Sequence, residues 1–292
     1  MNIHEEKQYF DLIKNINEKG TKETGRNGNT LSYFGNMMRF SLENSKLPLM
    51  TTKKLAWKTC FKELMFFIRG ETNNKLLKEK KVNIWNANGN REFLDSRGLH
   101  DRKEDDLGPI YGFQWRHWNA EYNDCEQDYS NKGIDQLKQI IETLKNPETR
   151  TSRRMILTAW NPEQLDSMAL PPCHVMAQFH VSNGNRLHCA LFQRSGDVAL
   201  GVPFNIASYS FLTHLIAHHC GLIAHEFVYF LGNAHIYEEH QNAMNSQMLR
   251  EPYDFPTLHF KCEPKEMEKY ELGDFDVKDY KHHEPIVMTM VA

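Results

Sequence analysis

Apolar side chains recur every three or four positions in three segments of the chain, residues 4–19, 54–69 and 134–144. This spacing places them along one face of an α-helix, so each segment is predicted to be a helix that packs against a core. Gly20 and Gly70 directly follow the first two segments, where glycine often ends a helix.

Pro203–Cys220 is also predicted to be a helix, but its apolar residues occupy nearly every face. A helix that is apolar all round is buried in the interior of a protein, and Gly221 suits its carboxyl end. We therefore expect one central buried helix. A further helix is predicted over Tyr237–Leu249.

Two runs rich in β-forming residues, His174–Val181 and Arg186–Phe192, are joined through Asn183-Gly184, a pair that favours a tight hairpin turn. Residues 30–42 alternate around Gly35, which indicates a strand with a bulge at that glycine. Shorter strands are predicted at Met155–Trp160, Val228–Leu231, Leu258–Cys262 and Ile286–Met290.

Residues 85–130 are polar and rich in Asn, Asp and Gly, so they are predicted to be largely loop. Elsewhere helices and strands mix without regular β-α-β alternation, which favours the α+β class. We expect a mixed, twisted β-sheet with flanking helices and one central buried helix, in a single domain over residues 1–292.

The charge of the chain is near neutral, with 35 Lys and Arg against 38 Asp and Glu and a net charge of −3. This balance offers no electrostatic footprint for nucleic acid. No apolar run approaches the roughly 18 residues of a membrane span, and the amino terminus lacks a secretory signal pattern. The six cysteines form no C-x-x-C pair, so we expect reduced thiols, no metal and a cytoplasmic protein.

Cys173 is a candidate nucleophile. It follows Pro171 and Pro172 at the start of a predicted strand, so its backbone is held in one direction. His174 is its neighbour, but adjacent residues on a strand point to opposite faces, which argues against His174 as its base. A buried structural cysteine is the alternative interpretation.

Several arginines supply a candidate anion site. Arg194 closes the strand that is predicted to pair beside Cys173, where a guanidinium would stabilise the thiolate and lower its pKa. Arg26, Arg153 and Arg154 would complete a phosphate clamp, since guanidinium binds phosphate oxygens in pairs. The alternative for each arginine is a solvated surface charge.

Four polar residues admit two interpretations each. Asn205 opens the buried helix, and it either reads the edge of a heterocycle or caps the helix. His235 and Tyr237 suit sugar hydroxyls, but a structural histidine is the alternative. Glu63 lies at the edge of an apolar helix face and is either a carboxyl of raised pKa or a solvated flank.

Taken together, these features resemble one family, the thymidylate synthases, over essentially the whole chain. The matching segments are Leu49–Lys53, Glu63–Gly70, Asp106–Arg116, Ala159–Pro162, Met168–His174, Gln193–Asp197 and Leu200–Tyr209. The resemblance implies reductive methylation of dUMP to dTMP, in dTTP biosynthesis. In that reaction 5,10-methylenetetrahydrofolate donates both the one-carbon unit and the hydride, and no metal takes part.

The resemblance also implies catalytic roles. Cys173 would add to C6 of the pyrimidine, with Arg194 supporting the thiolate and Asn205 holding N3–H and O4. Glu63 would organise proton transfer around O4, and Tyr111 would assist loss of the C5 proton. The residues implied to bind dUMP are Arg26, Arg153, Arg154, Gln193, Arg194, Ser195, Asp197, Asn205, His235 and Tyr237. Those implied to bind folate are Trp85, Asn88, Asp197, Leu200, Gly201, Phe204 and Ala292.

The resemblance further implies a homodimer in which Arg153 and Arg154 reach the phosphate of the partner's site. Two positions depart from the family, which commonly has aspartate where this chain has Asn86 and Asn233. A neutral amide cannot form the charged hydrogen bonds of a carboxylate, so we expect altered affinity rather than an altered reaction.

Three alternative functions remain at this stage. A hydroxymethylase of the same family that acts on dCMP would want aspartate at the position of Asn205, whereas one that acts on dUMP fits the residues equally well. An inactive relative that binds RNA or a protein is disfavoured by the intact set of Cys173, Arg194 and Asn205. A chain of 292 residues is expected to have no room for a fused reductase domain.

Overall fold

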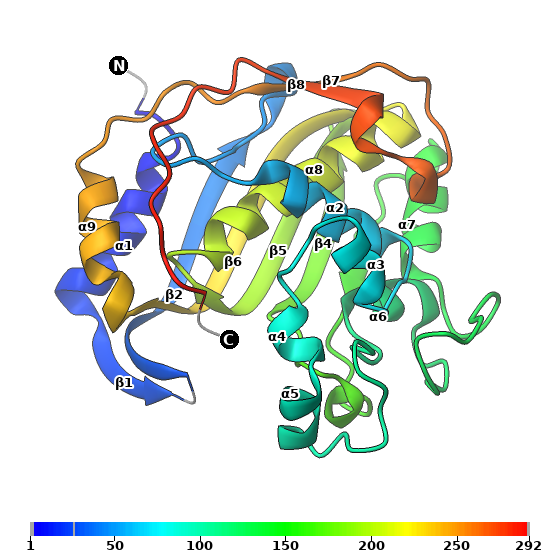
Figure 1. The fold of residues 1–292 in the computed structure, drawn as a ribbon. Coiled ribbons are helices and arrows are strands. Elements are labelled where there is room, and N and C mark those ends of the chain that lie inside the picture. Colours follow the sequence, from blue (N-terminus) through cyan, green and yellow to red (C-terminus); the bar gives the residue numbers. More distant parts are fainter. Residues whose placement is uncertain (1–2, 26, 291–292) are drawn as a thin grey trace.

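The computed structural model of the chain describes residues 3–25 and 27–290. Its centre is a six-stranded mixed sheet flanked by helices (Figure 1), which confirms the predicted α+β class. Parallel pairing joins β5 to β6, and the other neighbouring pairs of this sheet are antiparallel. The strands lie in the order β1 (Thr21–Gly25), β2 (Gly28–Ser41), β6 (Ile223–Tyr237), β5 (Arg186–Asp197), β4 (His174–Ser182) and β3 (Ile156–Thr158).

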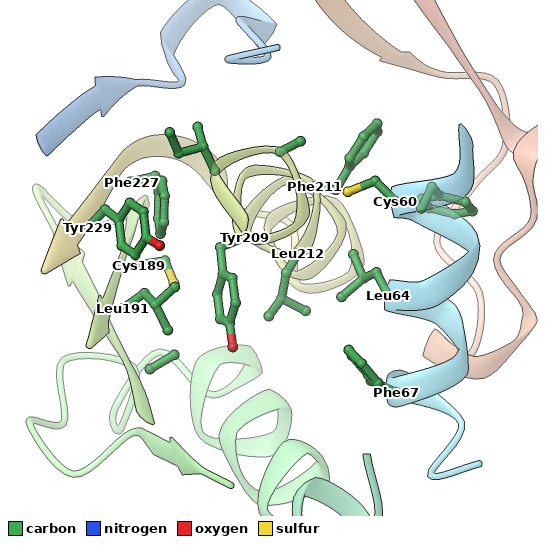
Figure 2. Close-up of a cluster of buried hydrophobic side chains, with 14 of the residues drawn as sticks. Cys60, Leu64, Phe67, Cys189, Leu191, Tyr209, Phe211, Leu212, Phe227 and Tyr229 are labelled. Atoms are coloured by element: carbon green, nitrogen blue, oxygen red, sulfur yellow. The ribbon is translucent and has the colours of Figure 1, made fainter. Parts of the chain in front are cut away.

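The predicted central helix is α8 (Gly201–Cys220), and it lies between the sheet and α2 (Trp57–Ile68), as Figure 2 shows. Phe211 and Leu212 are completely buried in α8, and burial of each such side chain stabilises the fold by about 1.5–3 kcal/mol. The helix ends, as expected, at Gly221, whose φ of 66° is the left-handed conformation that glycine adopts readily.

The other predicted helices are present as α1 (Lys7–Lys19), α7 (Gln136–Lys145) and α9 (Gln241–Met248). Shorter helices are α3 (Lys75–Glu79), α4 (Asn86–Gly89), α5 (Arg91–Ser96) and α6 (Tyr111–His117). Single 3₁₀ turns are η1 (Glu43–Ser45), η2 (Leu165–Ser167), η3 (Glu238–His240), η4 (Met267–Lys269) and η5 (Leu272–Asp274). Strands β7 (Thr257–Phe260) and β8 (Phe275–Lys278) pair separately. Among residues 3–25 and 27–290, no helix is both long and apolar enough to cross a membrane.

The hairpin prediction is confirmed, because Asn183 and Gly184 both have positive φ, 47° and 81°, between β4 and β5. The prediction that residues 85–130 are largely loop holds for most of the segment, although the short helices α4, α5 and α6 interrupt it. Asn90, a residue typical of loops, caps α5 by accepting the backbone N–H of Phe93.

Two predicted strand features are wrong. Ile286–Met290 has no regular structure, and β8 occupies the place beside β7 instead. Apolar side chains form a strand only where a neighbouring strand edge is available. Gly35 has a φ of 82°, but the register of β2 with β6 is the same on both sides of it, so no residue is inserted and there is no bulge.

The face of the sheet that points away from α8 carries an exposed apolar row. Met37 of β2, Phe230 of β6 and Phe192 of β5 lie side by side in one cross-strand row. Their exposed fractions are 47%, 41% and 43%, whereas the alternate residues Tyr229 and Leu191 are completely buried on the side of α8. An exposed apolar row of this kind marks a surface suited to contact with another protein.

Candidate active site

Cys173 directly precedes β4, and both its backbone N–H and its carbonyl are hydrogen-bonded. Its N–H donates to the hydroxyl oxygen of Tyr111 on α6 at 2.8 Å. Its carbonyl accepts the N–H of Arg194 on β5 at 2.9 Å. The thiol is therefore held at a fixed place between a helix and a strand, next to the rigid Pro171-Pro172 pair.

The guanidinium of Arg194 points at this thiol. Its Nη2 lies 4.0 Å from Cys173 Sγ, while Nε and Nη2 donate to the carbonyls of Pro172 and Pro171 at 2.9 and 3.0 Å. Burial raises the pKa of Cys173 above its ordinary value, although Arg194 and Tyr111 act to lower it. Arg194 therefore acts on the Cys173 pKa in the predicted direction, but desolvation outweighs it.

Asn205 lies inside α8, five residues beyond the N-cap residue Leu200, so the helix-cap interpretation is wrong. The N-cap residue Leu200 makes no side-chain capping bond, and Asp197 Oδ1 accepts the N–H groups of Ala199 and Leu200 in the turn ahead of the helix, at 2.8 and 3.3 Å. The Asn205 side chain faces the sheet, where its Oδ1 accepts from Gln193 Nε2 at 2.9 Å. Its Nδ2 lies 2.7 Å from Nε2 of His174. His174 is therefore hydrogen-bonded to Asn205, and it is not the base for the preceding Cys173.

Glu63 is buried on α2, with only 9% of its surface exposed, so the interpretation as a solvated flank is wrong. Trp85 Nε1 donates to its Oε1 at 2.8 Å. Burial raises the pKa of Glu63 to about 7, against a smaller lowering by the Trp85 hydrogen bond. The carboxyl therefore exchanges its proton near neutral pH, as a general acid or base must.

The candidate sugar-binding residues lie on the neighbouring strand. His235 of β6 pairs in register with Asp197 of β5, and its Nδ1 lies 3.1 Å from Asn233 Oδ1. Burial lowers the pKa of His235, although Asp197 acts in the opposite direction. Ser195 pairs in register with Asn233 on the same two strands, and Tyr237 ends β6.

Most of the candidate folate-binding residues lie at α4 and at the beginning of α8. Trp85 and Asn88 are buried at α4, while Leu200, Gly201 and Phe204 are partly buried where α8 begins. Arg26 and Ala292, which were predicted for phosphate and folate respectively, lie outside the described residues.

Arg153 and Arg154 are not brought to Cys173 of their own chain. Both side chains are exposed ahead of β3, and the Arg153 carbonyl accepts from Gln178 of β4 at 3.2 Å. Gln178 follows Cys173 by five residues, which is about 16 Å along a strand at about 3.3 Å per residue.

Comparison with known proteins settles the family. The sequence model described as thymidylate synthase matches residues 7–292. The chain belongs to the thymidylate synthase family. It is 53% identical over 292 residues to the bifunctional dihydrofolate reductase-thymidylate synthase of Leishmania amazonensis, covering 99% of this chain and 56% of that protein. It is 50% identical over 295 residues to thymidylate synthase 1/2 of Encephalitozoon cuniculi, covering 99% of this chain and 98% of that protein. The chain thus spans about half the length of the bifunctional relatives.

Asn86, where the thymidylate synthase family commonly has aspartate, belongs to a cluster of hydrogen-bonded polar side chains. Asn86 Oδ1 accepts from Asn74 Nδ2 at 3.2 Å, and the same nitrogen donates to Asp105 Oδ1 at 2.9 Å. Lys78 Nζ also lies 2.6 Å from Asp105. Because one carboxylate and one ammonium already pair here, a neutral residue at position 86 keeps the local charge balanced.

Tyr229 was missed in the sequence analysis, although it bonds directly to Gln193, with its hydroxyl 2.7 Å from Gln193 Oε1. A usable signal was present in the alternation of Phe227, Tyr229 and Leu231. A tyrosine on the inward face of a buried strand needs a hydrogen-bond partner for its hydroxyl, and that partner is often functional.

Replacing Glu63 by glutamine is expected to flatten the pH dependence of folding stability. A carboxyl whose folded pKa is about 7, above the ordinary 4.5, contributes stability that is fully present below pH 4.5 and is lost as the pH rises through about 7. The loss amounts to about 3 kcal/mol between about pH 4.5 and 8. Urea unfolding across this range measures it, with Glu142→Gln on an exposed face of α7 as the control. Parallel pH profiles for wild type and Glu63→Gln would contradict the raised pKa.

Proposed function

We propose that the protein methylates dUMP reductively to dTMP, a step of nucleotide biosynthesis, with 5,10-methylenetetrahydrofolate as the co-substrate and dihydrofolate as the second product. The observation that carries this proposal is the placement of the Asn205 carboxamide beside the Cys173 segment, through its bond to His174. A carboxamide has two donor and two acceptor positions, and protein atoms occupy one of each. One donor and one acceptor remain, which complement O4 and N3–H of uracil.

In this proposal the Cys173 sulfur bonds to C6 of the pyrimidine, and the electron pair of the 5,6 double bond makes C5 nucleophilic. Arg194, 4.0 Å from the sulfur, stabilises the thiolate from which the bond forms. Glu63, with a pKa near 7, moves the proton that O4 gains and loses. Tyr111 stands at the cysteine backbone, where it assists removal of the C5 proton.

The proposed dUMP site extends from this centre along β5 and β6. Gln193, Ser195, Asp197 and Asn205 would surround the base, and His235 with Tyr237 would hold the deoxyribose 3′-hydroxyl. Arg26 and Arg194 would bind the phosphate, together with Arg153 and Arg154 of a second copy of the chain.

The proposed folate site fits a flat ring system. The indole of Trp85 is anchored to Glu63 by its N–H, and Leu200 and Phe204 pack against the core with part of their surface free. Asn88, Asp197, Gly201 and Ala292 complete the set. The co-substrate supplies the methylene carbon and the hydride when it is bound, and the chain's residues orient it over the pyrimidine.

We further propose a cytoplasmic homodimer that is formed through the face of the sheet that points away from α8. Two observations support it. The cross-strand row of Met37, Phe230 and Phe192 is apolar and exposed, and burying it in a two-fold interface would remove it from water. Arg153 and Arg154 are exposed and distant from their own Cys173, as arginines donated to a partner's site would be.

The function is tested by incubating the protein with dUMP and methylenetetrahydrofolate and weighing the nucleotide product by mass spectrometry. A methyl group on the pyrimidine, formed with dihydrofolate, is the expected result. A hydroxymethyl product would identify the related hydroxymethylase instead. Unchanged dUMP in a protein that binds it would point to the inactive relative.

A further inference from the structure

We infer that Tyr229 is a positioning residue that sets the direction of the Asn205 carboxamide and thereby the preference for uracil over cytosine. The inference rests on the proposed function, because it names a base-selecting element of that same site. Tyr229 itself touches no substrate in this proposal. It acts through a chain of hydrogen bonds that runs from β6 to β5 and on to α8.

The first hydrogen bond of this series lies in the apolar core between the sheet and α8. Tyr229 is completely buried there, with its ring beside Phe227 and Leu191, as Figure 2 shows. Its hydroxyl is 2.7 Å from Gln193 Oε1. A buried hydroxyl proton needs an acceptor, and among the described residues this oxygen is the one that its hydrogen bond reaches.

Gln193 is thereby held in one orientation. Its Nε2 donates to the Ser195 carbonyl at 2.8 Å and to Asn205 Oδ1 at 2.9 Å. Turning the amide over would press Oε1 against the Ser195 carbonyl oxygen, and it would leave the Tyr229 proton facing an NH₂ group. Both changes are unfavourable, so the Ser195 carbonyl and the Tyr229 hydroxyl select the same orientation.

The orientation of Gln193 fixes Asn205 in turn. Since Gln193 presents a donor, Asn205 must present Oδ1 to it, which directs Nδ2 toward Nε2 of His174 at 2.7 Å. His174 Nε2 must then accept, so the ring is neutral with its proton on Nδ1. Burial keeps the ring neutral by lowering the pKa of His174 to about 4. Its Nδ1 is buried without a hydrogen-bond partner in the described part of the chain, so Asn205 alone selects the tautomer.

This direction of the Asn205 amide decides which base fits. It leaves one acceptor position on Oδ1 and one donor on Nδ2, which match the N3–H donor and O4 acceptor of uracil. The reversed amide would offer a donor to N3 and an acceptor to the exocyclic position, which match cytosine. Removing the Tyr229 proton takes away one of the two constraints against the reversed state.

The test is Tyr229→Phe, with kcat/KM measured for dUMP and for dCMP. Loss of one net hydrogen bond corresponds to about a fivefold change, so the dCMP-to-dUMP ratio is expected to rise about fivefold or more. Tyr209→Phe is the matched control, because Tyr209 is buried on α8 with its ring 5.4 Å from His174 but is not bonded to Gln193. Asn205→Asp, which carries an acceptor on both atoms, gives the upper reference for the ratio.

An unchanged ratio in a folded Tyr229→Phe protein would overturn the inference, as would an equal rise in Tyr209→Phe. If the wild type converts no dUMP, the proposed function fails, and the ratio of dCMP to dUMP binding by calorimetry then tests Tyr229 alone. If Tyr229→Phe does not fold, ¹⁵N NMR of histidine-labelled wild type decides, with the His174 signal assigned by its loss in His174→Gln. The expected signal is an unprotonated Nε2, and a protonated Nε2 would refute the chain of bonds.

Discussion

Replacing Cys173 by serine is expected to lower dUMP turnover by about a thousandfold or more, because a hydroxyl without an adjacent base is a far weaker nucleophile than a thiolate. The substitution changes one atom at a position whose backbone is held by Tyr111 and Arg194. Folding and dUMP affinity are therefore expected to persist. Steady-state turnover and calorimetric binding of dUMP, measured on the same preparation, separate the two effects.

Cys262→Ser is the matched control for this prediction. Cys262 is another partly exposed, free thiol, and it lies beyond β7, away from the proposed chemistry. Full activity in Cys262→Ser alongside loss in Cys173→Ser would assign the loss to the nucleophile. Turnover within tenfold of wild type in Cys173→Ser would remove Cys173 from this role.

A mixture of two inactive variants, Cys173→Ser and the double variant Arg153→Ala with Arg154→Ala, is expected to regain about a quarter of wild-type activity after joint unfolding and refolding. Random pairing makes about half of the dimers hybrid, and each hybrid has one site with both defects and one intact site. The expectation follows from the separation of these arginines from their own Cys173 along β4.

The control mixture pairs Cys173→Ser with Arg194→Ala. Arg194 lies 4.0 Å from the thiol of its own chain, so each site of that hybrid carries one defect and no activity should return. Size-exclusion chromatography with one tagged variant verifies that hybrids form. Hybrids without recovered activity in the first mixture would refute donation of the arginines across the dimer.

Local patterns in the sequence were sufficient for the elements whose stability comes from short-range periodicity. The apolar α8, the Asn183-Gly184 hairpin and helices α1 and α7 follow from spacing and turn chemistry alone. The same holds for the family, since its motifs are short segments whose order the chain preserves. Local patterns did not predict secondary structure correctly where contacts with residues distant in sequence determine it. Ile286–Met290 is apolar, yet it pairs with no strand in the described part of the chain.

At the site, the sequence by itself determined which chemical groups are present, and only the tertiary structure decided their protonation and direction. The pKa of Glu63 is raised because α2 buries it against Trp85, and burial of Cys173 outweighs the effect of Arg194. The spacing of Asn205 in the sequence favoured a helix cap, whereas in the fold its side chain bonds to Gln193 of β5. Desolvation and hydrogen-bond direction depend on atoms brought together from separate strands and helices, and no local pattern encodes them.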